Sequence, residues 1–427
     1  MFKQPLHILP QNGLTKKGIY MNKEIKILSN GAKIVSIKID GIKTLLTSCM
    51  VKAGSRVETE KTSGAAHFLE HMAFKGTHTK SYMDIAKAIE NYGGYMNANT
   101  STERTFYYTK TLSKHYKTSI DIITDIVFNS SFITEEFEKE RGVILQEILM
   151  YQDQPHAVLE DIAEKVKFPN HNLGRPILGS YQGITDMSKN TLIDFYKQFY
   201  QPNMMTFIVI GDLNHNEIQD EIESKIGHIK NTNENIIKYD CSYVGGNAIE
   251  YKDIEQAHVL ISYPLESIYD DSKYAVQLFN SILGNGVTSR LWEEIREKRG
   301  LAYSVSSNAT RTFEVGSFDI YCGTDLPKVA IDVIIELLEN FENTITEEDI
   351  LTSKEKIITN ICMSLETPSG ILNTELMKEL YGFETSVEEV IERFQNVQLE
   401  EVKNAFNNMI KNDKSIIQLL PKKMLSI

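Results

Sequence analysis

The sequence lacks the features of disulfide-rich, membrane-spanning and nucleic-acid-binding proteins. It has only 4 cysteines, at positions 49, 241, 322 and 362, and they form no CxxC pair. Neither a disulfide framework nor a thiolate zinc site is expected, and a reducing compartment is favoured. No apolar run approaches the roughly 18 residues that a membrane-spanning helix requires, so no membrane segment is expected. The net charge of −13, without any basic cluster, disfavours nucleic acid as a partner.

The composition is typical of a globular protein, with 41% hydrophobic and 24% charged residues. The length of 427 residues is too great for one ordinary domain. Residues 1–20 contain lysines and two prolines but no arginine, which argues against a targeting segment. The many lysine, isoleucine and asparagine residues are typical of an AT-rich coding genome. A bacterial cytoplasm is therefore favoured over a mitochondrial matrix as the location.

Strand and helix patterns occur twice in a similar order. The first series has strand patterns at 25–39 (a hairpin), 45–51, 95–100, 105–111 and 206–210, and helical patterns at 64–74, 81–92, 113–128, 135–152, 157–167, 189–200 and 215–226. The second has strands at 255–263, 301–310, 316–321 and 415–420, and helices at 271–283, 289–298, 327–340, 347–365, 371–381 and 399–408.

Because strands and helices segregate in blocks, an α+β fold is expected. We predict two similar domains, each a largely antiparallel sheet packed against helices, related as an internal repeat. The N-terminal domain, at 21–230, carries the metal site described next. A polar, glycine-containing linker at 231–247 joins it to a metal-free repeat domain at 248–427.

Residues 67–71 read His-x-x-Glu-His within a predicted helix. His67 and His71 are four residues apart, so their rings leave one face of the helix and can bind the same metal ion. Glu70 lies on that face and can polarise a metal-bound water without being a ligand. A catalytic zinc normally takes three protein ligands, so this zinc site needs one more side chain.

The predicted helix 135–152 offers that side chain. Glu140 and Glu147 are seven residues apart and share a face. Glu147 stands among apolar residues, and a buried carboxylate requires a counter-charge that a metal would provide. We therefore predict Glu147 as the third zinc ligand and Glu140 as a partner that orients a histidine or holds charge near the site.

Residues 67–77, HFLEHMAFKGT, closely resemble the signature of the pitrilysin and mitochondrial-processing-peptidase family, whose zinc motif is inverted relative to His-Glu-x-x-His. Glu147 stands where that family has its third ligand, and the resemblance also supplies Glu140 as an assisting carboxylate. Residues 93–100, GGYMNANT, look like the family's substrate strand, in which Asn97 and Ala98 would bind a peptide by strand addition. The alternative for this segment is an ordinary strand.

Residues 296–304, REKRGLAYS, resemble the family's other diagnostic block. There an arginine and a tyrosine help to bind substrate, and Arg296 and Tyr303 match them. The alternative is a salt-bridged arginine and a core tyrosine. The resemblance further implies a clamshell dimer in which Arg296 and Tyr303 reach the zinc site of the partner subunit. The short Gly284-Asn285-Gly286 segment is not the glycine-rich loop of the non-catalytic processing-peptidase subunit, so a homodimer is favoured.

These observations predict a zinc-dependent endopeptidase that hydrolyses unfolded peptides bound as an added strand. One Zn²⁺ per chain is expected; Glu70 would activate a water and Tyr303 would help to stabilise the carbonyl oxygen. Two alternatives stay open. The chain could be a non-catalytic peptide-binding or structural subunit of a processing-peptidase-like complex, since its second half has no His-x-x-Glu-His. It could also be a hydrolase of non-peptide substrates.

Overall fold

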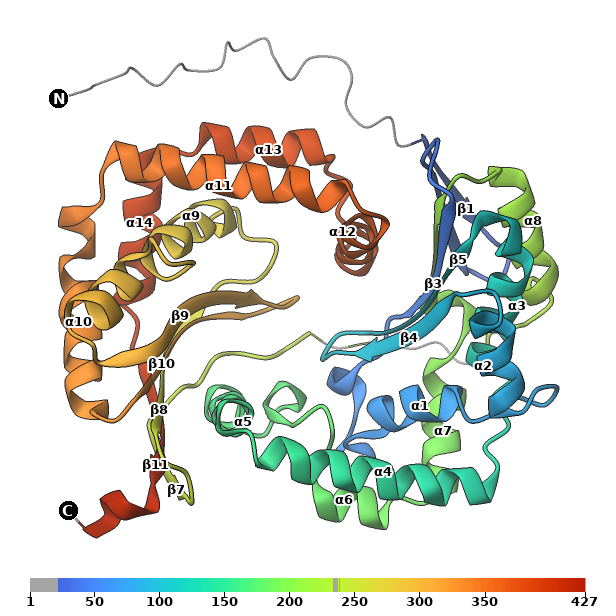
Figure 1. Ribbon diagram of the computed structural model, residues 1–427, viewed down its shortest axis with the longest axis horizontal. Helices are drawn as coiled ribbons and strands as arrows, with labels where there is room; N and C mark the ends of the chain where they lie inside the picture. Colours follow the sequence, from blue (N-terminus) through green and yellow to red (C-terminus); the bar gives the residue numbers. More distant parts are fainter. Residues whose placement is uncertain (1–21, 233–236, 238, 427) are drawn as a thin grey trace.

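The computed structural model describes residues 22–232, 237 and 239–426. The chain forms two halves, each a β-sheet with helices packed on it (Figure 1). The first half lies at the right of Figure 1 and the second at the left, and the helices α11 to α13 extend from the second half towards the first. The prediction of two similar α+β domains is confirmed, whereas the boundaries at 230 and 248 stay a prediction.

The first sheet has the strand order β1-β2-β6-β3-β5-β4. All neighbours pair antiparallel except β2 and β6, which are parallel. Its strands are β1 (Asn22–Ile27), β2 (Lys33–Lys38), β3 (Thr44–Val51), β4 (Tyr95–Thr100), β5 (Thr105–Leu112) and β6 (Met205–Gly211).

The second sheet has the order β7-β11-β8-β10-β9 and is antiparallel except between β7 and β11. The five strands of this sheet correspond in order and pairing direction to β2, β6, β3, β5 and β4 of the first sheet, which has β1 as an additional edge strand. This correspondence is the expected internal repeat. Its strands are β7 (Ala248–Lys252), β8 (Ala257–Leu265), β9 (Ala302–Arg311), β10 (Gly316–Thr324) and β11 (Ser415–Pro421).

Helices pack on both sheets and begin at recognisable signals. Serine, threonine or asparagine side chains cap several of them, as Ser81, Asn214 and Thr346 do, and Pro155 and Pro327 open others. The first half contains α1 (Ala65–Ala73), α2 (Tyr82–Glu90), α3 (Tyr116–Phe128), α4 (Thr134–Gln152), α5 (Pro155–Lys167), α6 (Tyr181–Asp186), α7 (Lys189–Phe199) and α8 (His215–Ile226). The second contains α9 (Lys273–Leu283), α10 (Pro327–Thr344), α11 (Glu347–Leu365), α12 (Pro368–Tyr381), α13 (Val387–Asn396) and α14 (Leu399–Ile410).

Shorter elements complete the chain, and some differ from the prediction. The segment 289–298 was expected as an ordinary helix, but Trp292–Lys298 is a π-helix, a wider form that often accompanies functional sites. The strand β7 and the helices α6 and α13 were not predicted. Single 3₁₀ turns lie at Ser55–Val57, Glu60–Thr62, Ser113–His115, Asn172–Gly174, Pro202–Met204 and Lys422–Ser426.

One helix of each half packs against the sheet of the other half. The face of the first sheet that carries Ile208 and Ile210 is covered by α12, through Leu372 and Leu376. On the second sheet, Leu260 packs with residues of β11 against α5. Each sheet is thus apolar on both faces, which explains why β6 reads as a nearly continuous apolar run.

Polar contacts add to this exchange. At the C-terminal end of α5, the buried Lys167 lies 3.1 Å from Asp319 on β10 and donates to Ser317. Elsewhere, Arg56 of the first half pairs with Glu314 of the second at 2.6 Å. Buried charges need such partners, so these pairs fix the relative placement of the two halves.

Candidate metal centre

The helix α1 carries the His-x-x-Glu-His motif and is held at its start by two features. Gly64 precedes it with φ of +89°, and a Cβ there would lie 2.6 Å from Ile184 and 2.7 Å from the carbonyl oxygen of Leu178. The buried Glu58 accepts hydrogen bonds from the backbone N–H groups of Gly64 and Ala66, both at 2.8 Å. A carboxylate at this place satisfies the first N–H groups of the helix and so fixes its direction.

The helix α4 packs against α1 and brings the carboxylates. Phe137 of α4 stacks on Phe68 of α1 with ring centroids 4.8 Å apart. Ile144 and Ile148 are buried, while Leu149 is 41% exposed. Glu147 was expected among buried apolar residues, but only part of its surroundings is buried. Its side chain is 26% exposed to solvent. It lies at the rim of the core, where a water or a substrate could reach it.

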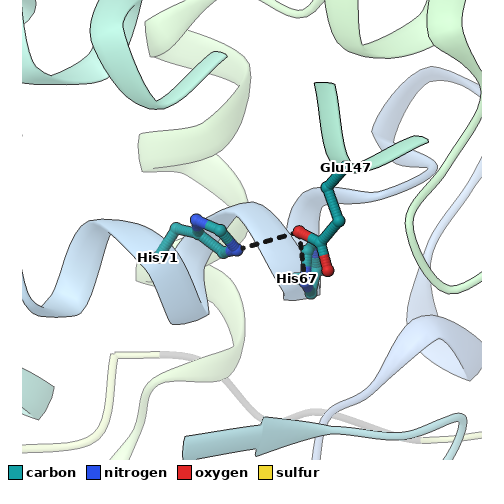
Figure 2. Close-up of side chains that lie close together, drawn as sticks. All are labelled: His67, His71 and Glu147. Atoms are coloured by element: carbon teal, nitrogen blue, oxygen red, sulfur yellow. Dashed lines mark ion pairs between the residues drawn. The ribbon is translucent and has the colours of Figure 1, made fainter. Parts of the chain in front are cut away.

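The three predicted ligands converge (Figure 2). One carboxylate oxygen of Glu147 lies 3.7 Å from Nε2 of His67 and 3.4 Å from Nε2 of His71. One ligand atom from each of the three residues lies within 4.8 Å of the others. Two imidazole nitrogens and a carboxylate oxygen are a common ligand set of a catalytic zinc, so the residues present fit that ion.

Burial favours the neutral, metal-binding form of His67. The residue is 8% exposed, and its burial, with a smaller effect of the nearby His71, lowers the pKa to about 3. A neutral imidazole offers a lone pair to a metal, whereas an imidazolium does not. The Nδ1 atom of His67 has no hydrogen-bond partner among the described residues. No hydrogen bond at Nδ1 therefore fixes the orientation of this ring.

Glu140 lies beside His71, where it was predicted to support the metal site. Its carboxylate accepts a hydrogen bond from Nδ1 of His71 at 3.0 Å and pairs with Lys75 at 2.8 Å. Burial would raise the pKa of Glu140, but these two partners outweigh burial and lower it. An ionised Glu140 keeps the proton of His71 on Nδ1 and leaves the Nε2 lone pair facing Glu147. Lys75 was not predicted as a partner of Glu140, although its spacing from His71 is helical.

Replacing Glu140 with alanine is expected to weaken zinc binding about 10- to 100-fold, because His71 loses the partner that fixes its ring and tautomer. Competition with a coloured chelator would measure the zinc dissociation constant. Glu135→Ala, an exposed glutamate on the same helix, is the matched control and should bind zinc as the wild type does. An unchanged affinity of Glu140→Ala would contradict the supporting role.

Glu70 lies beside the three ligands but does not belong to their group. The Thr100 hydroxyl at the end of β4 donates a hydrogen bond to its carboxylate. Burial raises the pKa of Glu70; Thr100 and His71 oppose this shift and the Glu147 carboxylate adds to it. A raised pKa makes a carboxylate a stronger base, as proton abstraction from water requires. No sequence pattern singled out Thr100 for this contact.

Comparisons with known proteins identify the family. Residues 33–180 match the family model for Insulinase (Peptidase family M16), and residues 186–357 match the model for the Peptidase M16 inactive domain. A Bacillus subtilis protein, the uncharacterized zinc protease YmxG, is 30% identical over 396 residues, which cover 92% of this chain and 97% of that protein. The chain belongs to peptidase family M16.

Further comparisons agree with the M16 assignment and confirm the predicted family. An uncharacterized zinc protease of Rickettsia felis is 31% identical over 394 residues, covering 91% of this chain and 95% of that protein. The crystal structure of a protease from Helicobacter pylori superposes with a TM-score of 0.89 at 22% identity, covering 94% of this chain and all of that one. This likeness supports the two-domain fold.

The predicted substrate strand of this M16 chain is an edge strand. Within the described residues β4 pairs with β5 alone, with Asn97 opposite Tyr108 and Ala98 opposite Tyr107. The side-chain oxygen of Asn97 accepts a hydrogen bond from the N–H of Ala98 at 2.9 Å. An incoming peptide strand could pair with the unoccupied edge, and one that accepts from the Ala98 N–H would displace the Asn97 side chain.

Arg296 and Tyr303 lie together, but the structure does not bring them to the zinc ligands. The guanidinium of Arg296 donates to the backbone oxygen of Tyr303 at 3.1 Å and lies over the rings of Tyr303 and Trp292, 4.4 and 4.1 Å from their centroids. Tyr303 is 77% exposed, so the alternative of a core tyrosine is wrong. In the part of the chain that the structure describes, no contact joins this pair to His67, His71 or Glu147.

A second group of metal-binding residue types, His171, Cys241 and Glu314, is already engaged in other contacts. Glu314 pairs with Arg56, and Nδ1 of His171 accepts a hydrogen bond from the Leu173 N–H. A cation would compete with the Arg56 guanidinium there, so this group does not resemble a metal site. Among the described helices, none is long and apolar enough to span a membrane.

Proposed function

We propose that this M16 chain is a zinc-dependent endopeptidase that cleaves unfolded peptides. The observation that carries the proposal is the convergence of His67, His71 and Glu147, with Glu70 beside them and the edge strand β4 ending at the Thr100 contact to Glu70. A peptide added to β4 would run past the catalytic groups in an extended conformation. Folded proteins expose few such segments, so unfolded chains would be preferred.

His67, His71 and Glu147 would hold one zinc per chain. When bound, zinc supplies Lewis acidity, which polarises a peptide carbonyl and acidifies a water. Glu70 would accept the proton of the attacking water and later give it to the nitrogen of the leaving amine. Thr100 orients the Glu70 carboxylate, and Glu140 holds His71. The edge of β4 would position the peptide backbone, so that Asn97 and Ala98 lie along the bound strand.

We further propose that the working form is a homodimer in a bacterial cytoplasm. Arg296 and Tyr303 are preorganised by their mutual contacts, and Tyr303 is exposed while Arg296 is partly exposed. A second copy could present this pair to the zinc site, where a guanidinium and a phenol would donate hydrogen bonds to a peptide carbonyl or to developing negative charge. All 4 cysteines are free, as in proteins of a reducing compartment.

Incubating the protein with a mixed peptide library and reading cleavage by mass spectrometry tests the proposal. Cleavage is expected, and a chelator should reduce it to background because the Lewis acid is removed; added zinc should restore it. A tightly folded protein that contains a cleaved sequence is the control and should stay intact. Protein that binds stoichiometric zinc but cleaves no peptide would contradict the proposal and favour the non-catalytic subunit.

A further inference from the structure

A cavity of about 550 Å³ lies in the second half, away from the zinc ligands. The helices α9, α11, α12 and α13 and the end of β9 form it. Its walls are mainly apolar and include Ile361, Leu365, Phe383, Val390 and Phe394. This volume is in the range of cavities that bind small molecules, roughly 300–1,000 Å³.

The charged residues of this cavity all have one sign. Lys273, Arg311 and Lys378 line it, whereas no aspartate or glutamate does. The whole chain carries 58 acidic and 45 basic residues, so three cations without an acid depart from the average of the molecule. The cavity therefore combines apolar walls with positive charge.

None of the three cations forms an ion pair with a carboxylate within the described residues. Nζ of Lys273 donates to the backbone oxygen of Ile268 at 2.9 Å and lies 4.5 Å from the centroid of the Phe383 ring. Arg311 donates to the carbonyl oxygens of Glu266 and Ser267.

The contacts of the neighbouring acids leave the positive charges of the cavity without a carboxylate partner. Asp271, the nearest acid before Lys273 in the sequence, pairs with Arg393 at 3.0 Å, and the neighbouring Asp270 accepts a hydrogen bond from the Ser272 N–H at 2.8 Å. Burial lowers the pKa of Lys273, and the charges of Arg393 and Arg311 add to this shift, whereas Asp271 and Asp270 oppose it only in part. The Lys378 ammonium has no hydrogen bond or ion pair among the described residues. A ligand with one anionic group would supply the missing partner.

The rest of that ligand must be apolar. A peptide inserted among these side chains would lose hydration of its backbone N–H and C=O groups and would find few partners, because the amide and aliphatic hydroxyl side chains of the cavity are limited to Gln277, Thr310, Ser364, Thr374 and Thr385. An alkyl chain has no such groups and gains from burial. We propose that this cavity binds a medium-chain monocarboxylate, with its carboxylate at Lys273 and Lys378 and its chain against Leu365, Val390 and Phe394.

The position of the cavity connects it to both halves. Met377 on α12 is one of its lining residues, and Nη1 of Arg104 lies 3.6 Å from the Met377 sulfur. Arg104 belongs to the turn between β4 and β5, at the end of the proposed substrate strand. A bound carboxylate would therefore rest on the helix that covers the first sheet, although binding itself does not depend on peptidase activity.

Isothermal titration of the full-length protein with sodium decanoate tests the proposal. Decanoate should bind with a 1:1 stoichiometry, and octanoate about tenfold more weakly, because two methylene groups fewer are buried. Decyltrimethylammonium, which carries the opposite charge, should not bind. The variant Lys378→Glu should bind decanoate at least tenfold more weakly, whereas Lys328→Glu on α10 should bind it as the wild type does.

A second variant separates binding from misfolding. Val390→Trp should fill the cavity and remove decanoate binding. Both Lys378→Glu and Val390→Trp should keep the circular dichroism spectrum of the wild type, which would show that they are folded. The proposal is overturned if decanoate fails to bind at millimolar concentration, or if it binds equally well to wild type and to both variants. It is also overturned if only peptides with apolar C-terminal residues bind.

Discussion

Glu70→Gln is expected to lower the rate of peptide hydrolysis about 100- to 10,000-fold while one zinc per chain is retained. Glutamine has nearly the shape of glutamate but cannot accept a proton from water at neutral pH. His67, His71 and Glu147 are unchanged in this variant, and Thr100 can still donate a hydrogen bond to the amide oxygen. Cleavage of the peptide library and the metal content by atomic absorption would be measured on the same preparation.

The matched control is Glu135→Gln, an exposed glutamate of α4 that pairs with Lys139 on the surface. It should cleave peptides at the wild-type rate. Equal activity of wild type and Glu70→Gln would point to a contaminating peptidase or to another site. Loss of zinc along with activity would mean that Glu70 supports the metal, and its role as the base would then be untenable.

Mixing two inactive variants is expected to restore activity if the site is shared between subunits. One variant is Glu70→Gln; the other combines Arg296→Ala with Tyr303→Phe. In a heterodimer of the two, one zinc site keeps Glu70 and receives the wild-type arginine and tyrosine. Random exchange makes half of all dimers heterodimers with one intact site of two, so about one quarter of wild-type activity should return.

Size-exclusion chromatography with light scattering would first establish the dimer, and peptide cleavage would be followed during subunit exchange. Exchange of Glu70→Gln with itself is the control and should recover nothing. If the double variant is fully active alone, Arg296 and Tyr303 have no part in catalysis. A mixture of dimers that stays inactive after complete exchange would show that the pair acts within its own chain.

The convergence of the candidate zinc ligands was predictable because much of it is local or follows from helix periodicity. The spacing of His67 and His71 places both rings on one face of α1, and the family resemblance supported the more distant Glu147. The contacts of Thr100 and Lys75 were not predicted, because they depend on how β4 and α4 are placed around α1. Such placement is set by packing between segments distant in sequence, which residue spacing does not encode.

The two similar domains were predicted because local periodicity marks most of their helices and strands. The prediction was incomplete where an element is too short for a periodic pattern, or where packing joins segments distant in sequence. Alternation and helical periodicity marked most elements. The helix α6 has only six residues, too few for a periodic signal, whereas α13 carries apolar Val387, Val390 and Phe394 at helical spacing and could have been found. No local pattern indicates that α5 and α12 pack on the sheet of the opposite half.

That exchange of helices has a consequence for how the chain folds during synthesis. The face of the first sheet that carries Ile208 and Ile210 stays uncovered until α12, far downstream of β6 in the sequence, has left the ribosome. Contacts between segments so far apart in sequence form slowly, and an exposed apolar sheet face favours aggregation in the meantime. The nascent first half is therefore a natural client for a chaperone. Once folded, the two halves should unfold in one cooperative transition, even after proteolytic cleavage of the segment that joins them.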